Sequence, residues 1–349
     1  MRAAYRAIEL YDPRRAPCAI DLSDNTNLFG IAPSLRRTLA ELGSETFTRY
    51  PSVFAATLKR ALAELHAVEP ENIATGCGSD DIIDSAIRAF CEPGDVVAFP
   101  DPTFGIVNTF ARMNAARPTP VPSGPDFAVD APALAQLGAP VTYLCSPNNP
   151  TGTVSSAYVI AGLDARLAGV LLLDEAYAMF GDVDHASFAV RSARTISTRT
   201  LSKAWGLAGL RIGYAIGPAP LILEIEKSRG PYKVNAIGEA AAIAAIAADR
   251  SWVADVVAQT KQNRGRLADG LAEQGIRCWP SAANFILMQA PAGWSAQALA
   301  GALRERGVAV RPFAGLPGAG DCIRVSVGPW DMMTAFLAAL NQVLSATRV

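Results

Sequence analysis

The chain has 349 residues, with 31 lysines and arginines against 32 aspartates and glutamates, and 50% of its residues are hydrophobic. This near-neutral balance argues against a basic nucleic-acid binder, an acidic disordered chain and a charge-driven membrane anchor. At about 150 residues per domain, the length predicts roughly two globular domains.

The first half of the chain predicts an α/β architecture. Residues 1–45 are less regular than the rest, and we interpret them as an arm that packs on the second domain. From residue 72 to about 217, short apolar runs alternate with helical patterns, which is typical of a mainly parallel sheet covered by helices. The expected strands are residues 96–99, 141–145, 169–173, 195–201 and 211–216. A helix is expected after Ser79, ending before Pro93.

The second half predicts helices followed by a smaller α+β unit. Residues 225–275 are helical in pattern and rich in alanine, and strands are expected at 285–288, 308–310 and 323–327 before a closing helix at 331–344. We therefore predict a three-layer α/β/α large domain at 46–236 and a smaller α+β C-terminal domain at 237–349.

The sequence lacks the segments and residue patterns that several kinds of site require. The longest apolar run, residues 240–248, is about half of what a bilayer span needs, and Glu9 and Asp12 interrupt any signal peptide. We therefore expect a cytoplasmic protein. The six cysteines form no C-x-x-C pair and the chain has only two histidines, so neither a disulfide framework, a metal site nor a Ser-His-Asp triad is expected.

Two expected strands end in polar residues. Residues 169–173 run into Asp174-Glu175-Ala176-Tyr177, and ligands bind at the carboxyl ends of parallel strands. An aspartate there also suits a helix N-cap, so residue type alone leaves both roles open. Residues 141–145 run into a turn with two prolines, in which Asn149 precedes Pro150 and is held extended. Its amide can face a ligand or belong to an ordinary turn.

A third strand, residues 195–201, leads into Ser202 and Lys203. Burying an ammonium group there is costly, and burial lowers a lysine pKa from about 10.4 toward that of a neutral amine that attacks carbonyl carbons. The alternative is a surface lysine lying along the sheet rim. The two neighbouring strand ends favour a functional lysine.

These motifs resemble those of the fold-type I pyridoxal-phosphate aminotransferases, and most of all the histidinol-phosphate aminotransferases. The resemblance rests on Asn149 in Pro-Asn-Asn-Pro-Thr-Gly, on Asp174 and Tyr177 in Asp-Glu-Ala-Tyr, and on Lys203 in Leu-Ser-Lys-Ala-Trp-Gly-Leu-Ala-Gly-Leu-Arg. It implies the cofactor pyridoxal 5'-phosphate. Lys203 would bind it as a Schiff base and move a proton, Asp174 would keep its ring nitrogen protonated, and Asn149 and Tyr177 would donate to its phenolic oxygen.

The resemblance also implies a phosphate cradle and a shared active site. Gly78, Ser79 and Asp80 stand at a helix start, where backbone N–H groups bind anions. The remaining cofactor contacts implied are the phosphate donors Ser202 and Arg211, and Phe104 on the ring face. Tyr50 matches a tyrosine that reaches the phosphate of the neighbouring subunit, which implies a homodimer. Alternatively, Tyr50 caps a hydrophobic cluster with Phe54.

For the substrate, Arg324 matches the family's anion-binding arginine, and Arg311 is a second candidate for the distal group. Asn25 and Phe29 lie in Asn-Thr-Asn-Leu-Phe-Gly, where the histidinol-phosphate enzymes tend to have Asn-Glu-Asn-Pro-Tyr-Gly. Phe29 lacks the phenol that would help to bind a substrate phosphate, so the distal group recognised can differ.

The resemblance implies amino transfer from L-histidinol phosphate to 2-oxoglutarate. Two enzyme alternatives stay open: an aminotransferase for another amino acid in a specialised biosynthetic pathway, and a threonine-phosphate decarboxylase-like protein. A non-enzymatic regulator of similar fold is not favoured. Such proteins carry a helix-turn-helix before the first motifs, and residues 1–45 have neither the length nor the basic character for one.

Overall fold

The computed structural model describes residues 5–6, 8–10 and 17–346. Asp12 lies outside this part, as does much of the segment on which the expected lack of a signal peptide depends. None of the helices in the described ranges combines the length and the apolar character that crossing a bilayer requires.

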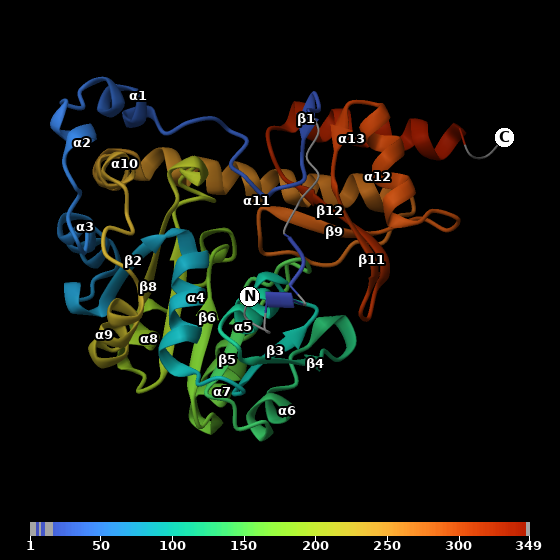
Figure 1. Cartoon of the computed structure of the whole chain (residues 1–349). Coiled ribbons are helices and arrows are strands. Elements are labelled where there is room, and N and C mark those ends of the chain that lie inside the picture. Colours follow the sequence, from blue (N-terminus) through green and yellow to red (C-terminus); the bar gives the residue numbers. More distant parts are fainter. Residues whose placement is uncertain (1–4, 7, 11–16, 347–349) are drawn as a thin grey trace.

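A central sheet of seven strands confirms the expected mainly parallel architecture, in the order β2-β8-β7-β6-β5-β3-β4 (Figure 1). Only β8 runs antiparallel to its neighbours among these strands. The strands are β2 (Ile73–Cys77), β3 (Val96–Asp101), β4 (Arg117–Pro122), β5 (Val141–Cys145), β6 (Val170–Asp174), β7 (Thr195–Thr200) and β8 (Ile212–Ile216).

Helices cover both faces of this sheet and complete three layers. One face carries α4 (Gly78–Phe90), α5 (Ile106–Met113) and α9 (Ala219–Ser228). The other carries α3 (Ala56–His66), α6 (Ala131–Gln136), α7 (Ala157–Arg166), α8 (Ala186–Arg191) and α10 (Ala236–Ala248). Short 3-10 helices lie at η2 (Pro70–Asn72), η3 (Pro125–Phe127), η4 (Ala178–Phe180) and η5 (Ala208–Leu210).

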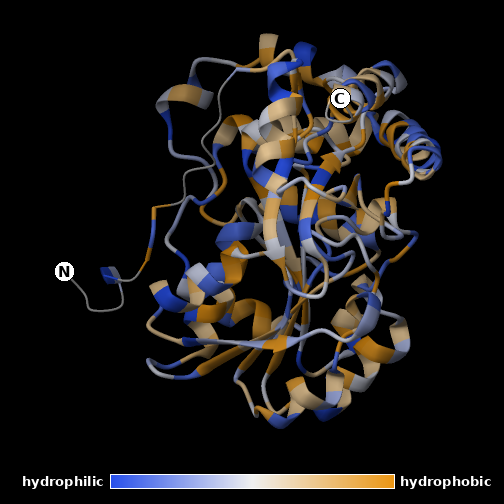
Figure 2. Cartoon of the chain, turned by 90° about the vertical axis from the view of Figure 1, so that its right-hand side faces the viewer, coloured by the Kyte–Doolittle hydropathy of each residue, from blue (hydrophilic) through white to orange (hydrophobic). Residues whose placement is uncertain are grey.

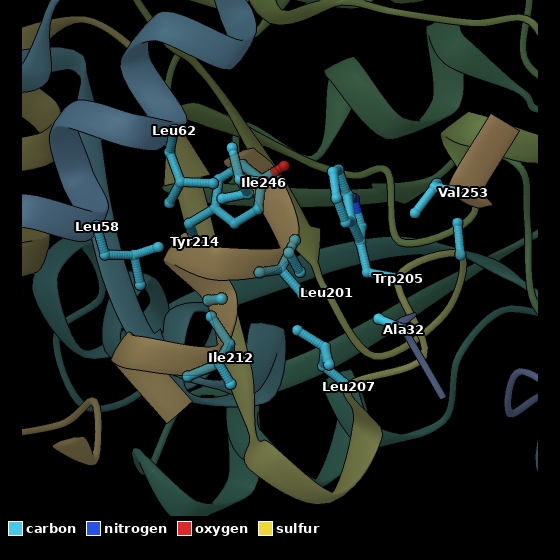
Figure 3. Close-up of a cluster of buried hydrophobic side chains, with 14 of the residues drawn as sticks. Ala32, Leu58, Leu62, Leu201, Trp205, Leu207, Ile212, Tyr214, Ile246 and Val253 are labelled. Carbon is cyan, nitrogen blue, oxygen red and sulfur yellow. The ribbon is translucent and has the colours of Figure 1, made fainter. Parts of the chain in front are cut away.

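The core is built by the periodicity of each element. In α4, as expected, Ile82, Ile83 and Ile87 are fully buried against the sheet. On the opposite face, Leu58 and Leu62 of α3 point toward β8 (Figure 3). Viewed from the side, hydrophobic residues gather on the strands inside the lower half of the molecule (Figure 2). This burial fixes the strand ends, and with them the loops that follow.

The C-terminal part forms a second, antiparallel sheet in the order β11-β12-β9. Its core lies between this sheet and three helices, in which Phe336 and Leu340 are fully buried. The elements are α11 (Arg250–Glu273), β9 (Phe285–Gln289), α12 (Ala296–Glu305), β10 (Val308–Ala309), β11 (Arg311–Leu316), β12 (Gly320–Ser326) and α13 (Trp330–Ala346). The strand β11 was not expected from the sequence.

The described part of the N-terminal segment lies across both units. Its strand β1 (Ile20–Asp21) pairs with β10, while α1 (Pro33–Ala40) lies beside α10 (Figure 1). The Ser34 hydroxyl donates to Asp249 Oδ2 at 2.5 Å, which ties α1 to the residue before α11. The helix α2 (Glu45–Thr48) follows. The domain boundary at residue 236 stays a prediction: α10 begins there, but this helix packs on α3 and β8 of the large sheet unit.

Candidate active site

A cavity of about 560 Å³ opens at the carboxyl ends of β5, β6 and β7, between the two sheets. Most of the predicted site residues line it. They are Asn25 from the N-terminal segment, Ser79, Asp80, Phe104, Asn149, Asp174, Tyr177, Ser202, Lys203 and Arg211 from the large sheet unit, and Arg311 and Arg324 from the second sheet.

Lys203 follows the end of β7 and contributes an amine to the cavity lining. Its Nζ donates to the Asp24 carbonyl oxygen at 3.4 Å and lies 5.6 Å from the centre of the Tyr177 ring. Burial and the positive charge of Arg324 lower the pKa of Lys203 from 10.5 to about 8, although Asp80 opposes the shift. About a tenth of the Lys203 side chains are therefore neutral amines at pH 7, far more than for an ordinary lysine.

Asp174 is the last residue of β6 and lies opposite Cys145 in the strand register. Its Oδ2 accepts from the Tyr143 hydroxyl at 2.6 Å, and its Oδ1 accepts from the Ala176 N–H at 3.0 Å. Burial raises the pKa of Asp174 to about 6, while these two donors favour the ionised form. The carboxylate is thus suited to hold a cation inside the cavity.

Tyr177 owes its orientation to Asn25. The Asn25 amide nitrogen donates to the Tyr177 hydroxyl oxygen at 3.1 Å, and the Asn25 backbone is held by Ser326 and Asn284 of the second sheet unit. Because its oxygen already accepts this bond, Tyr177 keeps its own hydrogen for a different acceptor. Burial raises the pKa of Tyr177 well above its usual value, so the hydroxyl stays a donor.

The start of α4 has no space for a side chain at two glycines that border it. A Cβ on Gly78 would lie 2.6 Å from Arg211 Nη2. A Cβ on Gly213 would lie 2.1 Å from the backbone of Gly78 and Ser79. The backbone N–H groups of this helix start, the nearby serine hydroxyls and one guanidinium make a donor set that fits a phosphate.

The opposite wall carries two arginines on paired strands. Arg324 of β12 is buried and donates to Asn149 Oδ1 at 2.5 Å and to the Ser23 carbonyl oxygen at 2.7 Å. Arg311 of β11 lies directly opposite Arg324 in the register. The Asn149 oxygen is occupied by Arg324, so its amide nitrogen is the group left to donate elsewhere.

Three predicted residues are not part of the cavity lining: Gly78, which precedes the lining residue Ser79, and Tyr50 and Phe29. Tyr50 is 84% exposed and stacks on Tyr232, with 4.9 Å between the ring centres. Phe29 is partly buried outside the cavity lining, and its N–H donates to Asn27 Oδ1 at 2.9 Å. This local turn fixes the position of the Phe29 backbone.

The sequence reasoning did not single out Tyr143, although its hydroxyl contacts Asp174. The available signal was a tyrosine within an expected buried strand, because a buried tyrosine hydroxyl usually has a hydrogen-bond partner. It also left out Phe313 and Ile106, which add apolar surface to the cavity wall. Neither residue belongs to a recognisable motif.

The chain has a mainly parallel sheet between two layers of helices. A lysine, a carboxylate and a donor set that fits a phosphate lie at one edge of this sheet. Together these features define a pyridoxal-phosphate enzyme of fold type I. The family model for aminotransferase class I and II matches residues 18–340, so the chain belongs to this family and is a pyridoxal-phosphate-dependent transaminase.

Individual relatives agree with this assignment. Histidinol-phosphate aminotransferase 1 of Nostoc sp. is 33% identical over 99% of this chain and 98% of its own length. An aromatic amino acid aminotransferase of Rhodococcus jostii is 35% identical over 97% and 94%. The crystal structure of histidinol-phosphate aminotransferase from Sinorhizobium meliloti in complex with pyridoxal-5'-phosphate has a TM-score of 0.89 and 28% identity, covering 99% of this chain and 98% of that one.

Proposed function

We propose that the chain transfers an amino group from L-histidinol phosphate to 2-oxoglutarate. The observation that carries this proposal is the pair of arginines on β11 and β12, which offers the cavity two guanidinium groups. Both proposed substrates carry an anionic group distant from the reacting carbon, and guanidinium groups bind carboxylates and phosphates with two parallel hydrogen bonds. The named activity of the Nostoc relative supports the choice of donor.

The proposed roles follow from the surroundings of each residue. When bound, pyridoxal phosphate withdraws electrons from the substrate carbon that loses a proton. Lys203, with a pKa near 8, holds the cofactor covalently and then carries that proton. Asp174 pairs with the ring nitrogen and Phe104 packs on the ring face. Tyr177 and Asn149 each have a hydrogen to donate to the phenolic oxygen.

The remaining residues bind anions. Gly78, Ser79 and Asp80 present the helix start, and Ser202 with Arg211 completes the proposed phosphate cradle. Asp80 Oδ2 accepts from Arg211 Nη2 at 3.1 Å, so its carboxylate orients the guanidinium. Arg324 binds the anionic group of each substrate, a carboxylate in 2-oxoglutarate and the phosphate in L-histidinol phosphate, and Arg311 the distal group.

An aromatic amino acid is a second candidate donor. Phe104, Ile106 and Phe313 give the cavity an apolar side. The Rhodococcus relative is named for this activity. An apolar wall binds an aromatic ring by burial of its surface, with no need for a phosphate.

The visible absorbance of the purified enzyme with its cofactor separates these candidates. We expect L-histidinol phosphate to bleach the visible band and 2-oxoglutarate to restore it, whereas the Lys203→Ala variant should lack the band of the covalently held cofactor. Bleaching by phenylalanine or tyrosine, but not by L-histidinol phosphate, would replace the proposed donor. Release of carbon dioxide from threonine phosphate would instead indicate decarboxylation.

We further propose that the enzyme is a cytoplasmic homodimer in which Tyr50 reaches the cofactor phosphate of the partner subunit. The exposure of Tyr50, away from the cavity of its own chain, supports this arrangement. Tyr50→Phe should weaken cofactor retention without changing the oligomeric state. A fully active monomer in analytical ultracentrifugation would contradict the proposal.

A further inference from the structure

Tyr143 lies directly behind Asp174 and outside the cavity. Its side chain on β5 is fully buried, and its hydroxyl donates to Asp174 Oδ2 at 2.6 Å. Asp174 lines the cavity whereas Tyr143 does not. The short distance is typical of a hydroxyl bonded to an ionised carboxylate. Tyr143 therefore contacts the anion that the proposed function assigns to the cofactor ring nitrogen.

We propose that Tyr143 is a positioning residue: its hydroxyl fixes the Asp174 carboxylate and holds it in the ionised form, so that the shared proton stays on the cofactor ring nitrogen. The inference rests on the role proposed for Asp174. A positively charged ring is the form that withdraws electrons best. The residue would thus act on the reaction only through Asp174.

The surroundings of Asp174 give the hydroxyl this influence. The titratable groups that face the carboxylate are Tyr143 and Cys145 on β5, Asp80 on α4, and Tyr177 in the loop after β6. Burial and the charge of Asp80 both favour the protonated acid, and burial keeps the Cys145 thiol neutral by raising its pKa. Hydrogen bonds oppose them, and the largest of these contributions comes from Tyr143, followed by the Ala176 N–H.

Geometry also explains why a tyrosine is needed at this position. Cys145 lies opposite Asp174, and side chains two residues apart on a strand share a face. Tyr143 is thus on the same face of β5 as Cys145, and the length of its ring brings the hydroxyl forward to the carboxylate. A phenylalanine would fill the same volume and leave Asp174 Oδ2 without this donor.

The experiment is Tyr143→Phe in the holoenzyme, with Tyr214→Phe as the matched control. Tyr214 is equally buried in the same sheet, but its hydroxyl is paired with His66 Nε2 at 2.8 Å. Both variants lose one buried hydrogen bond and should lose similar thermal stability. Only Tyr143→Phe should move the NMR signal of the nitrogen-labelled cofactor ring toward that of a neutral pyridine, and lower kcat about tenfold with little change in KM.

Two further substitutions separate the inference about Tyr143 from the proposed role of Asp174. Fluorotyrosine at position 143 keeps the shape and strengthens the donor, so the ring signal should move in the opposite direction. Asp174→Asn is the reference: if this substitution leaves the ring signal unchanged, the proposed role of Asp174 is wrong. If Asp174→Asn moves the signal and neither change at Tyr143 does, the role of Asp174 stands and the inference about Tyr143 is overturned.

Discussion

At the scale of single residues, the site holds charge where burial disfavours it. Lys203 lies beside the positive Arg324, and Asp174 is buried beside apolar strands. Both pKa values move toward neutrality, to about 8 and about 6. Groups with pKa values in this range exchange protons readily at the pH of the cell. The same pKa shifts make the apoprotein less stable than it would be with apolar residues at these two positions.

For Lys203 the direction of the pKa shift determines how the stability of the apoprotein changes with pH. Its folded pKa of about 8 lies below the ordinary 10.5, so below pH 8 the folded apoprotein carries a disfavoured charge. Between pH 8 and 10.5 the unfolded chain binds the extra proton, and the stability of the folded state rises with pH. We predict that apo Lys203→Met is more stable than the apo wild type at pH 7, by up to about 3 kcal/mol.

Urea unfolding of the two apoproteins across pH measures this difference. The advantage of the Lys203→Met variant should shrink between pH 8 and 10.5. Lys227→Met is the control, because Lys227 is an exposed lysine on α9 with an ion pair to Glu224. A constant advantage at every pH would contradict the shifted pKa of Lys203.

The contact between Asn25 and Tyr177 gives a second prediction at this scale. Asn25 has a φ of +55°, which aspartate tolerates better than most residues. Asn25→Asp keeps this backbone but replaces the amide donor by an acceptor, so the Tyr177 hydrogen should turn away from the cofactor. We expect kcat to fall about tenfold.

A double-mutant cycle with Tyr177→Phe checks this prediction. If Asn25 acts through Tyr177, the substitution Asn25→Asp should have little further effect once Tyr177 is phenylalanine. Additive losses in the double variant would show that Asn25 acts independently of Tyr177, for example through its bonds to the second sheet unit.

At the scale of elements, close backbone contact between β8 and the start of α4 shapes the proposed phosphate cradle. No side chain can stand at Gly213, because its Cβ would lie 2.1 Å from the Gly78 carbonyl carbon and the Ser79 nitrogen. The strand therefore brings the helix start and Arg211, the residue before β8, to the same place. The antiparallel direction of β8 contributes to this geometry, since Arg211 then lies at the cavity end of the sheet.

We predict that Gly213→Ala separates β8 from α4. The variant should lose about 3 kcal/mol or more of stability, because overpacking against backbone cannot be relieved by rotating a side chain. It should also release cofactor more readily. Thermal unfolding and dialysis against phosphate buffer measure the two effects. Gly209→Ala is the control, since a Cβ there meets nothing within 4 Å; equal behaviour of the two variants would contradict the prediction.

Some elements could be predicted from sequence and others could not. The strand Val141–Cys145 begins and ends as predicted, because an apolar run is bounded by prolines and a polar turn. The strand Arg117–Pro122 was not expected, since Pro118, Pro120 and Pro122 argue against a strand. The position of β4 explains why these prolines are tolerated. It is an edge strand that pairs only with β3 in the described sheet.

The same division holds for the site. Asp174 and Lys203 lie at the ends of strands that could be predicted. Because these strand ends lie at the same edge of the sheet, the closeness of the two side chains could be inferred from the sequence. The bond from Tyr143 to Asp174 depends on strand register, which one sequence does not specify. The place of Phe29 depends on the path of the N-terminal segment, which is set by its contacts with β10 and with Asp249, the residue before α11, rather than by local pattern.

At the scale of the whole molecule, an aromatic surface around α2 remains exposed. Phe47, Tyr50 and Phe54 are 64%, 84% and 51% exposed, respectively. Large aromatic side chains gathered on one surface are typical of protein interfaces. This surface includes Tyr50, the residue that the proposed homodimer places at the partner's cavity. Association and cofactor binding should therefore fail together.

We predict that Phe47→Glu with Phe54→Glu weakens association about tenfold or more and lowers cofactor retention. Sedimentation across a concentration series and the visible cofactor band measure the two properties. Tyr158→Glu is the control, because Tyr158 is 83% exposed on α7, away from α2 in Figure 1. A stable dimer in the double variant would place the interface elsewhere.

The end of β6 has a consequence for how the chain tolerates change in length. Asp174 faces the cavity, whereas its neighbour Glu175 bonds Arg199 at 2.7 Å and His185 at 2.9 Å outside it. A slip of one residue along this strand would exchange the two acids between these environments. Insertions or deletions within residues 170–174 should therefore be far less tolerated than equal changes in the loops, even where the new residue is hydrophobic.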